Sequence, residues 1–227
     1  MCRKLKFQQG EGKMGRITLV TLPRFPRRLI QSFEQIPADG YLKETFCYRK
    51  RCYSTGYLKN GIFKWDEKSP SFIQSEKLNT YLGGITRQFH PISQAIRNDI
   101  EKNIISTAYK FLPPFDYSIG IHQIRIIANK LNQGMPAPEG IHQDGFDFVT
   151  IACINTVNVS GGVSLILDAH DYAKIFFEGI LLPGMLLVFS DKTFAHYTSN
   201  ISPKLPGEAR RDVIVTTFQH LNSLKKS

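Results

Sequence analysis

Residues 139–148 read EGIHQDGFDF and place an imidazole, at His142, two residues before a carboxylate, at Asp144. Successive side chains on a β-strand point to opposite faces, so on a strand His142 and Asp144 would share a face and Gln143 would point away. If that face looked into a barrel, two ligands of a metal ion would already be in place. The alternative is a solvated turn that happens to contain both residues.

A third ligand is available in residues 183–199, PGMLLVFSDKTFAHYTS, where His196 lies just beyond an apolar strand expected at 185–189. Two histidines and one carboxylate form the facial triad of non-haem Fe(II) oxygenases, which leaves three coordination positions open. Zinc hydrolases use the same residue types but prefer tetrahedral sites with a bound water. The chain has neither an HExxH motif nor an HxE-type glutamate, so His142, Asp144 and His196 favour Fe(II).

The second half of the chain has the pattern of a β-protein. Many short strands separated by Gly/Pro turns, such as Gly161-Gly162 and Pro183-Gly184, predict a β-sandwich or barrel. The β-rich runs are expected at 119–128, 146–157, 163–167, 180–190 and 211–219.

The first half has mixed character. A short amphipathic helix is expected at 24–35, and the dipeptide Asn60-Gly61 between aromatic runs predicts a hairpin within 41–65. Apolar residues spaced three to four apart predict a helix over 92–111. These residues are Ile92, Ile96, Ile100, Ile104, Ala108 and Phe111.

These elements predict a mainly β fold with flanking helices in one domain of residues 1–227. Within it we expect a flexible segment 1–15, a supporting helical and hairpin region 16–115, and a β core 116–220. The 227 residues suit one full core. No segment reads as a linker that would divide them.

Composition points to a cytoplasmic protein. The chain has no run of about 18 apolar residues that could span a membrane, and its N-terminus lacks the apolar region of a signal peptide. The four cysteines form no CxxC pair and are expected to be free thiols in a reducing compartment.

The net charge of +10 is concentrated in the first 60 residues, which hold 13 Lys and Arg against 4 Asp and Glu. Basic patches such as RFPRR (24–28) and YRKR (48–51) could contact nucleic acid or another anionic surface. No nucleic-acid-binding motif accompanies the charge, so a solvated face that steers acidic small molecules is the favoured interpretation.

Arg211 opens the last expected strand, RDVIVTTF (211–218), 15 residues after His196. A guanidinium there could form a bidentate pair with the far carboxylate of a dicarboxylic cosubstrate that chelates iron. Alternation puts Arg211 on the face of Val213, Val215 and Thr217. Arg210 is the competing candidate on the opposite face, and an arginine that opens a strand is otherwise usually solvent-facing.

This order of motifs resembles the Fe(II)/2-oxoglutarate-dependent dioxygenases: HxD, a distal His after a PGxLLVF strand, and an Arg at the head of the last strand. A closer resemblance, to bacterial free-amino-acid hydroxylases of the isoleucine 4-hydroxylase type, spans roughly the last 60% of the chain. It is carried by TRQF (86–89), IGIHQIR (119–125), IHQDG (141–145), INTVNVSGG (154–162), MLLVFSDKTFAH (185–196) and EARRDVIVTTF (208–218).

The resemblance implies a double-stranded β-helix, or cupin-like jelly roll, with iron at its mouth. His142, Asp144 and His196 would bind Fe(II), and Arg211 would bind the distal carboxylate of 2-oxoglutarate. With O2, the enzyme would hydroxylate an unactivated C–H of a free L-amino acid or similar small carboxylate and release succinate and CO2. Related halogenases have a small residue at the aspartate position, so Asp144 favours hydroxylation.

Candidates for substrate binding are Arg125, Gln123 and Arg87. Alternation places Arg125 with Gln123, opposite His122, where it could bind the substrate's α-carboxylate or form a structural ion pair. Arg87, in TRQF, has the same two possibilities. Two other functions remain open: the same chemistry on a protein or nucleic-acid residue, and a non-catalytic jelly-roll binding module.

Overall fold

A computed structural model of the chain describes residues 6–7, 17–42, 46–68, 71–74, 76 and 83–221. The flexible segment expected at 1–15 lies outside these residues except for Lys6–Phe7. The elements in chain order are β1 (Lys6–Phe7), β2 (Ile17–Thr21), α1 (Arg27–Gln31), η1 (Ser32–Gln35), β3 (Arg49–Lys59), β4 (Ile62–Trp65), α2 (Gln94–Ile100), η2 (Glu101–Ile105), α3 (Ser106–Tyr109), β5 (Tyr117–Ala128), β6 (Phe148–Val157), β7 (Val159–Gly161), β8 (Val163–Asp168), β9 (Ile175–Ile180), β10 (Met185–Ser190), β11 (Phe194–Thr198), β12 (Ile201–Pro203) and β13 (Ala209–His220).

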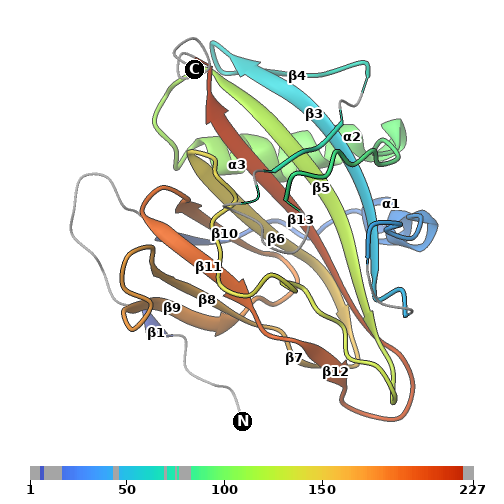
Figure 1. Cartoon of the computed structure of the whole chain (residues 1–227). Coiled ribbons are helices and arrows are strands. Elements are labelled where there is room, and N and C mark those ends of the chain that lie inside the picture. The colour runs from blue at the N-terminus through green and yellow to red at the C-terminus, as the bar shows by residue number, and fades with distance from the viewer. Residues whose placement is uncertain are drawn as a thin grey trace.

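The strands form a large sheet and a small sheet that face each other (Figure 1). The large sheet has the order β2-β10-β6-β13-β5-β3-β4 and the small sheet the order β1-β9-β8-β11. A two-stranded ribbon, β12-β7, lies at one end, and the pairings between these strands are antiparallel. This confirms the expected double-stranded β-helix with flanking helices.

Alternation along β6 divides the core into two layers. Val149, Ile151 and Cys153 point between the two sheets, where they pack with Ile166 and Phe177 of the small sheet. The intervening side chains of β6 point to the other face of the large sheet, where the helices lie. The inner layer forms the wall on which the functional site is built.

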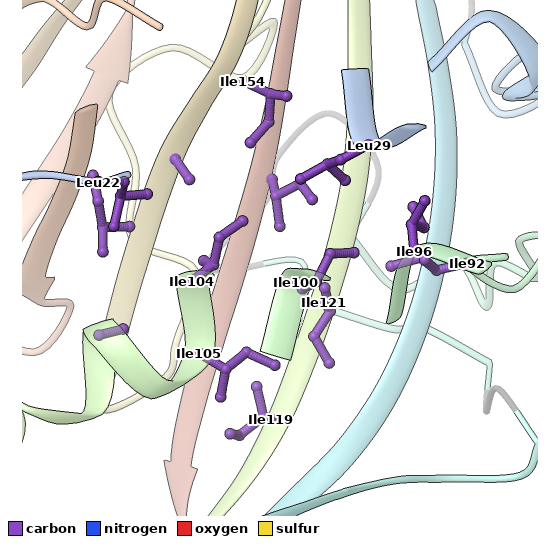
Figure 2. Close-up of a cluster of buried hydrophobic side chains, with 14 of the residues drawn as sticks. Leu22, Leu29, Ile92, Ile96, Ile100, Ile104, Ile105, Ile119, Ile121 and Ile154 are labelled. Carbon is purple, nitrogen blue, oxygen red and sulfur yellow. The ribbon is translucent and has the colours of Figure 1, made fainter. Parts of the chain in front are cut away.

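The helical segment 94–109 covers the outer face of the large sheet (Figure 2). The sequence spaces its buried residues four apart, at Ile96, Ile100, Ile104 and Ala108. A step of four residues exceeds the 3.6-residue turn of an α-helix, so such a stripe drifts around the helix. The π-helical turn η2 takes more residues per turn and keeps the stripe, together with Ile105, against the sheet.

Several elements differ from the expected ones, among them the short strands β7, β11 and β12, which lie outside the expected β-rich runs. The strand expected at 180–190 is β10 alone and begins at Met185, because the chain turns at 181–184, with Gly184 at a φ of +88°; the residues before the turn form the separate strand β9. The N-terminal region contributes more than helices and a hairpin, because β2, β3 and β4 are three of the seven strands of the large sheet. The β3–β4 hairpin turns at Asn60-Gly61, as expected.

No helix in the part of the chain that the structure describes has the length and apolar character needed to cross a bilayer.

Candidate metal centre and cosubstrate pocket

The structure brings His142, Asp144 and His196 together at one end of the space between the sheets. One potential ligand atom from each lies within 4.8 Å of the others. The Nε2 atom of His142 is 3.8 Å from Asp144 Oδ1, and that of His196 is 3.6 Å from Asp144 Oδ2. Two imidazoles and one carboxylate are therefore close enough to bind the same metal ion.

The way the chain positions His142 differs from the expected strand. His142 and His196 form an isolated antiparallel bridge, with backbone N–H···O distances of 3.1 and 2.8 Å, and residues 143–147 form an irregular loop. His142 and Asp144 thus converge because one is bridged to β11 and the other follows on a turn. The two-residue spacing does not reflect strand alternation here.

Asp191 fixes the loop 143–147 through hydrogen bonds to its backbone. Its carboxylate accepts N–H bonds from Asp144, Gly145 and Phe146, at 3.1, 2.6 and 3.0 Å. Gly145 has a φ of +89°, which a side chain would strain. Burial and the neighbouring Asp144 raise the pKa of Asp191 to about 7. Its oxygen also lies 3.8 Å from His196 Nδ1, which is too far for a hydrogen bond, so the support from Asp191 reaches the loop that carries Asp144.

The surroundings shift the pKa values of the two imidazoles in opposite directions. Burial and His142 lower the pKa of His196 well below its ordinary value, which keeps its ring neutral. Burial also acts to lower the pKa of His142, but Asp144 and Glu139 outweigh it and raise the pKa. His142 Nδ1 lies 2.9 Å from the Gly140 carbonyl, so this nitrogen can donate to it and leave Nε2 to the metal.

Arg211 lies in the pocket that contains this triad. Its side chain is 4% exposed and lines the pocket with Val213, Val215 and Thr217, the face given by alternation along β13. Within the described residues Nη2 has no hydrogen-bond partner. Arg210 points to the opposite face and pairs with Glu34. A buried guanidinium that lacks an acidic partner is costly unless a ligand supplies one.

A family model described as 2OG-Fe dioxygenase matches residues 30–217, most of the chain. The chain therefore belongs to the 2OG-Fe dioxygenase family. It is accordingly a non-haem iron enzyme that uses Fe(II), 2-oxoglutarate and O2.

Individual relatives agree with this 2OG-Fe dioxygenase assignment. The chain is 29% identical to L-isoleucine-4-hydroxylase of Bacillus thuringiensis over 200 residues, 82% of each protein. It superimposes on a bsmA homolog from Methylobium petroleophilum with a TM-score of 0.75 at 25% identity, covering 86% of this chain and 80% of that one. The structure of IDO from Bacillus thuringiensis shares the fold, with a TM-score of 0.66 at 23% identity over 84% and 83% of the two chains.

The donor set fits the 2OG-Fe dioxygenase cofactors. Two imidazoles and a carboxylate are the ligands of Fe(II) in sites that leave coordination positions open for other ligands. The unpartnered Nη2 of Arg211 fits the far carboxylate of a 2-oxo diacid.

Arg87 joins the metal ligands through one side chain. It is 1% exposed; its Nη2 donates to Gln74 Oε1 at 3.0 Å, and Gln74 Nε2 donates to Asp144 Oδ1 at 2.9 Å. Its Nε has no partner among the described residues. The structure therefore places Arg87, a sequence-based substrate candidate, in the pocket beside the metal site.

Arg125 and Gln123 lie away from the pocket. Alternation along β5 turns them to the helix-covered face, where Gln123 donates to Ser32 Oγ at 2.8 Å. Arg125 pairs with Asp212 at 2.7 Å and with Glu34 at 2.8 Å. The geometry matches the structural ion-pair alternative, so neither residue belongs to the substrate site built here.

Three residues of the site escaped sequence reasoning. Gln74 and Asp191 act through hydrogen bonds that only the folded chain creates. Glu139 lines the pocket, with Oε1 at 3.2 Å from His142 Nε2. Its place three residues before His142 was a signal that could have been used, because an acid so near a ligand faces the same space.

Proposed function

We propose that this dioxygenase hydroxylates an unactivated C–H of a free L-amino acid or a similar small carboxylate, with release of succinate and CO2. In this proposal His142, Asp144 and His196 hold Fe(II), and Arg211 binds the distal carboxylate of 2-oxoglutarate. The observation that carries it is the convergence of the triad in one pocket with Arg211, which is buried and has no ion-pair partner among the described residues. The name of the relative from Bacillus thuringiensis supports an amino-acid substrate.

Fe(II) with 2-oxoglutarate and O2 supplies the oxidising chemistry, and the protein supplies position and charge. Arg211 aligns the cosubstrate along the wall formed by Val213 and Val215 of β13. Gln74, held by Arg87, fixes one oxygen of Asp144 and thereby its orientation. Residues that lock a ligand's rotamer in this way tune both metal affinity and substrate alignment.

Two charged groups suit the two ends of a free amino acid. Arg87 offers an unpartnered Nε to an α-carboxylate. Glu139 is the acid, other than Asp144, among the described lining residues, and its carboxylate suits an α-ammonium group. A pocket with both charges near the metal favours a zwitterion over an internal residue of a peptide, whose backbone is uncharged.

The proposal is tested by incubating purified protein with Fe(II), 2-oxoglutarate and each of the twenty amino acids in turn. We expect substrate-dependent succinate and a product heavier by one oxygen atom for at least one of them. His196→Ala should abolish both, whereas His170→Ala, at an exposed histidine, should retain them. If none of the twenty amino acids changes the amount of succinate formed, although the protein binds iron and 2-oxoglutarate, the substrate is not a free amino acid of this panel.

A further inference from the structure

Five arginines of the described chain are buried, and they fall into two groups. Arg49 pairs with Asp39 at 2.7 Å, and Arg125 pairs with Asp212. The ion pairs within the described residues include none of Arg51, Arg87 and Arg211. All three of these acid-free arginines line the pocket of the metal triad.

Arg51 is held without neutralisation. Its guanidinium carbon lies 4.7 Å from the ring centroid of Phe89 and 5.1 Å from that of Phe72. Its Nη2 lies 2.9 Å from Nδ1 of His122. Burial and Arg51 lower the pKa of His122 well below its ordinary value, so the imidazole is a neutral acceptor. Aromatic faces and a neutral ring fix the guanidinium in place, but they bring no negative charge.

The charge of Arg51 persists at neutral pH. Burial and the nearby Arg49 lower its pKa to about 9, while Asp39 and Asp144, which form no ion pair with it, act in the opposite direction. A buried cation of this kind is expensive unless an anion accompanies it. No carboxylate of the described residues forms an ion pair with Arg51, so we infer that its counterion comes from what the pocket binds.

The proposed function assigns all three carboxylates of the two ligands, the one next to the keto group of 2-oxoglutarate being the end that chelates the metal. The far carboxylate of 2-oxoglutarate belongs to Arg211 and the α-carboxylate of an amino acid to Arg87, in the proposed function on which this step rests. An aliphatic amino acid would therefore leave Arg51 unpaired in the loaded enzyme. One further negative charge on the substrate would remove that cost.

The strands separate an apolar wall from a cationic wall. The apolar wall comprises Val213 and Val215 on β13, Ile124 and Ile126 on β5, and Ile151 on β6. The cationic wall comprises Arg49 and Arg51 on β3, with Arg87 and Gln74 beside them. Strand β5 lies between β3 and β13; on it, Ile124 pairs with Arg51 of β3 and Ile126 pairs with Arg211 of β13. Arg51 is therefore two strands away from Arg211 and offset by two residues along the strand, which corresponds to about 12 Å between their Cα atoms. The cosubstrate on Arg211 thus faces the apolar wall.

We propose that the substrate carries a second anionic group besides its α-carboxylate, and that Arg51 on the cationic wall binds it. The preferred substrate is then an acidic amino acid, with a carboxylate or phosphate at the end of its side chain. A branched aliphatic side chain placed there would instead have to cover a guanidinium that it cannot pair with. Glu139 remains available for the α-ammonium group.

The experiment compares each acid with its uncharged counterpart: L-aspartate with L-asparagine, L-glutamate with L-glutamine, and O-phospho-L-serine with L-serine. Dissociation constants are measured by calorimetry without O2, on protein loaded with Fe(II) and 2-oxoglutarate, so that no turnover occurs. We expect at least one acid to bind about tenfold or more tightly than its counterpart, as for a charge-assisted bidentate pair. The carboxylate and phosphate arms distinguish the two kinds of anion.

Glutamate resembles 2-oxoglutarate and could bind at the cosubstrate position. The measurement is therefore repeated at a second, higher concentration of 2-oxoglutarate. An acid that binds at the substrate position keeps its affinity when 2-oxoglutarate is raised, whereas one that competes for Arg211 weakens in proportion. Competition of that kind for every preferred acid would overturn the inference.

Variants assign the discrimination to Arg51. In Arg51→Gln the ratio of acid to counterpart affinity should fall toward one, and Arg51→Lys should retain part of it. Arg27→Gln makes the same change at an exposed position and should keep the full ratio. Retention of the ratio in Arg51→Gln would overturn the assignment.

The wild-type comparison needs no variant and separates the two proposals. If neutral amino acids bind and are hydroxylated as well as or better than every acid, the inference fails while the proposed function stands. If the loaded protein binds none of these six and none of the remaining standard amino acids, the free-amino-acid substrate of the proposed function itself fails.

Discussion

Arg211 and Arg210 are neighbours in the chain but lie on opposite faces of β13, and their surroundings assign them different work. Arg211 is buried and lines the pocket, whereas Arg210 pairs with Glu34 on the helix-covered side. Composition cannot distinguish two adjacent arginines, but strand alternation can. This pair therefore offers a matched test of the cosubstrate clamp.

Arg211→Lys should weaken 2-oxoglutarate binding by roughly 10- to 100-fold, about 1.5–3 kcal/mol, because an ammonium cannot form the bidentate pair of a guanidinium. The measurement is the dissociation constant of 2-oxoglutarate for the Fe(II)-loaded protein without O2. Arg210→Lys is the control and should change it by less than about twofold. Equal losses in the two variants would contradict a clamp at Arg211.

Asp191→Asn should lower the affinity for Fe(II) by roughly 10- to 100-fold, as for other residues that orient metal ligands. The carboxylate accepts three N–H bonds from the loop that carries Asp144, and an amide has only one oxygen to accept them. Metal titration of the apoprotein measures the effect. Asp171→Asn, on an exposed loop, should leave metal affinity unchanged. An unchanged affinity in Asp191→Asn would show that the loop holds itself.

For single residues, the sequence indicates those whose side chains are unusual in their local context. It does not indicate those that act through hydrogen bonds to residues far away in the chain. His142, Asp144, His196 and Arg211 could be named because imidazoles, an acid and an arginine interrupt apolar runs. Asp191 looks like an ordinary turn residue until the fold brings residues 144–146 to it.

At the scale of elements, β5 shows how alternation gives faces but not their contents. The sequence correctly grouped Arg125 with Gln123 opposite His122, but it could not say which face looked into the pocket. The outer face is closed by η1, whose Glu34 reaches Arg125. Because β5 is buried on both faces, its sequence does not show which face lines the pocket and which packs against the helices.

Arg125→Gln should destabilise the fold by about 3–5 kcal/mol, because it leaves the Asp212 carboxylate, 1% exposed, without its ion-pair partner. Urea denaturation monitored by circular dichroism measures the free energy of unfolding. Arg28→Gln breaks a pair with Asp99 in which the arginine is 60% exposed, and its effect should be much smaller because solvent screens that pair.

Binding measurements give the other half of this test. For the folded fraction of Arg125→Gln, the dissociation constants of 2-oxoglutarate and of the amino-acid substrate should match those of the wild type. A weaker substrate affinity with unchanged stability would return Arg125 to the substrate site.

Helix boundaries were predictable, but the local geometry within the helix was not. The apolar residues from Ile92 to Ala108 gave the helix over 92–111, observed as 94–109. The π-helical turn arises from packing a four-residue repeat against a sheet. A sequence carries that repeat, but the surface that selects the wider turn comes from strands far along the chain.

At the scale of the whole molecule, the charge excess of the first 60 residues is partly internal. The sequence predicts a possible basic edge at YRKR (48–51), but Arg49 and Arg51 are buried and line the pocket. Arg24 and Arg27 are exposed. Net charge by segment therefore overstated the basic surface, because charge alone does not indicate which side of a strand it occupies.

The proposed site joins the two sheets. His196 belongs to β11 of the small sheet and His142 is bridged to it, whereas Arg211 belongs to the large sheet. A 2-oxo diacid chelated at one end and paired with Arg211 at the other would therefore connect layers that otherwise meet through apolar contacts. Metal and cosubstrate should then stabilise the fold together more than the sum of their separate effects.

We expect 2-oxoglutarate at about 100 times its dissociation constant to add about 2.7 kcal/mol of stability to the Fe(II)-loaded protein. For a chain of this length that corresponds to a rise of roughly 5–10 °C in Tm. The same concentration should shift the metal-free protein far less, because only Arg211 then holds the ligand. Thermal unfolding without O2 in four states, with and without each ligand, measures the coupling. Arg211→Lys should reduce the cosubstrate shift and keep the metal shift, whereas equal cosubstrate shifts with and without Fe(II) would mean that the diacid does not bridge the sheets.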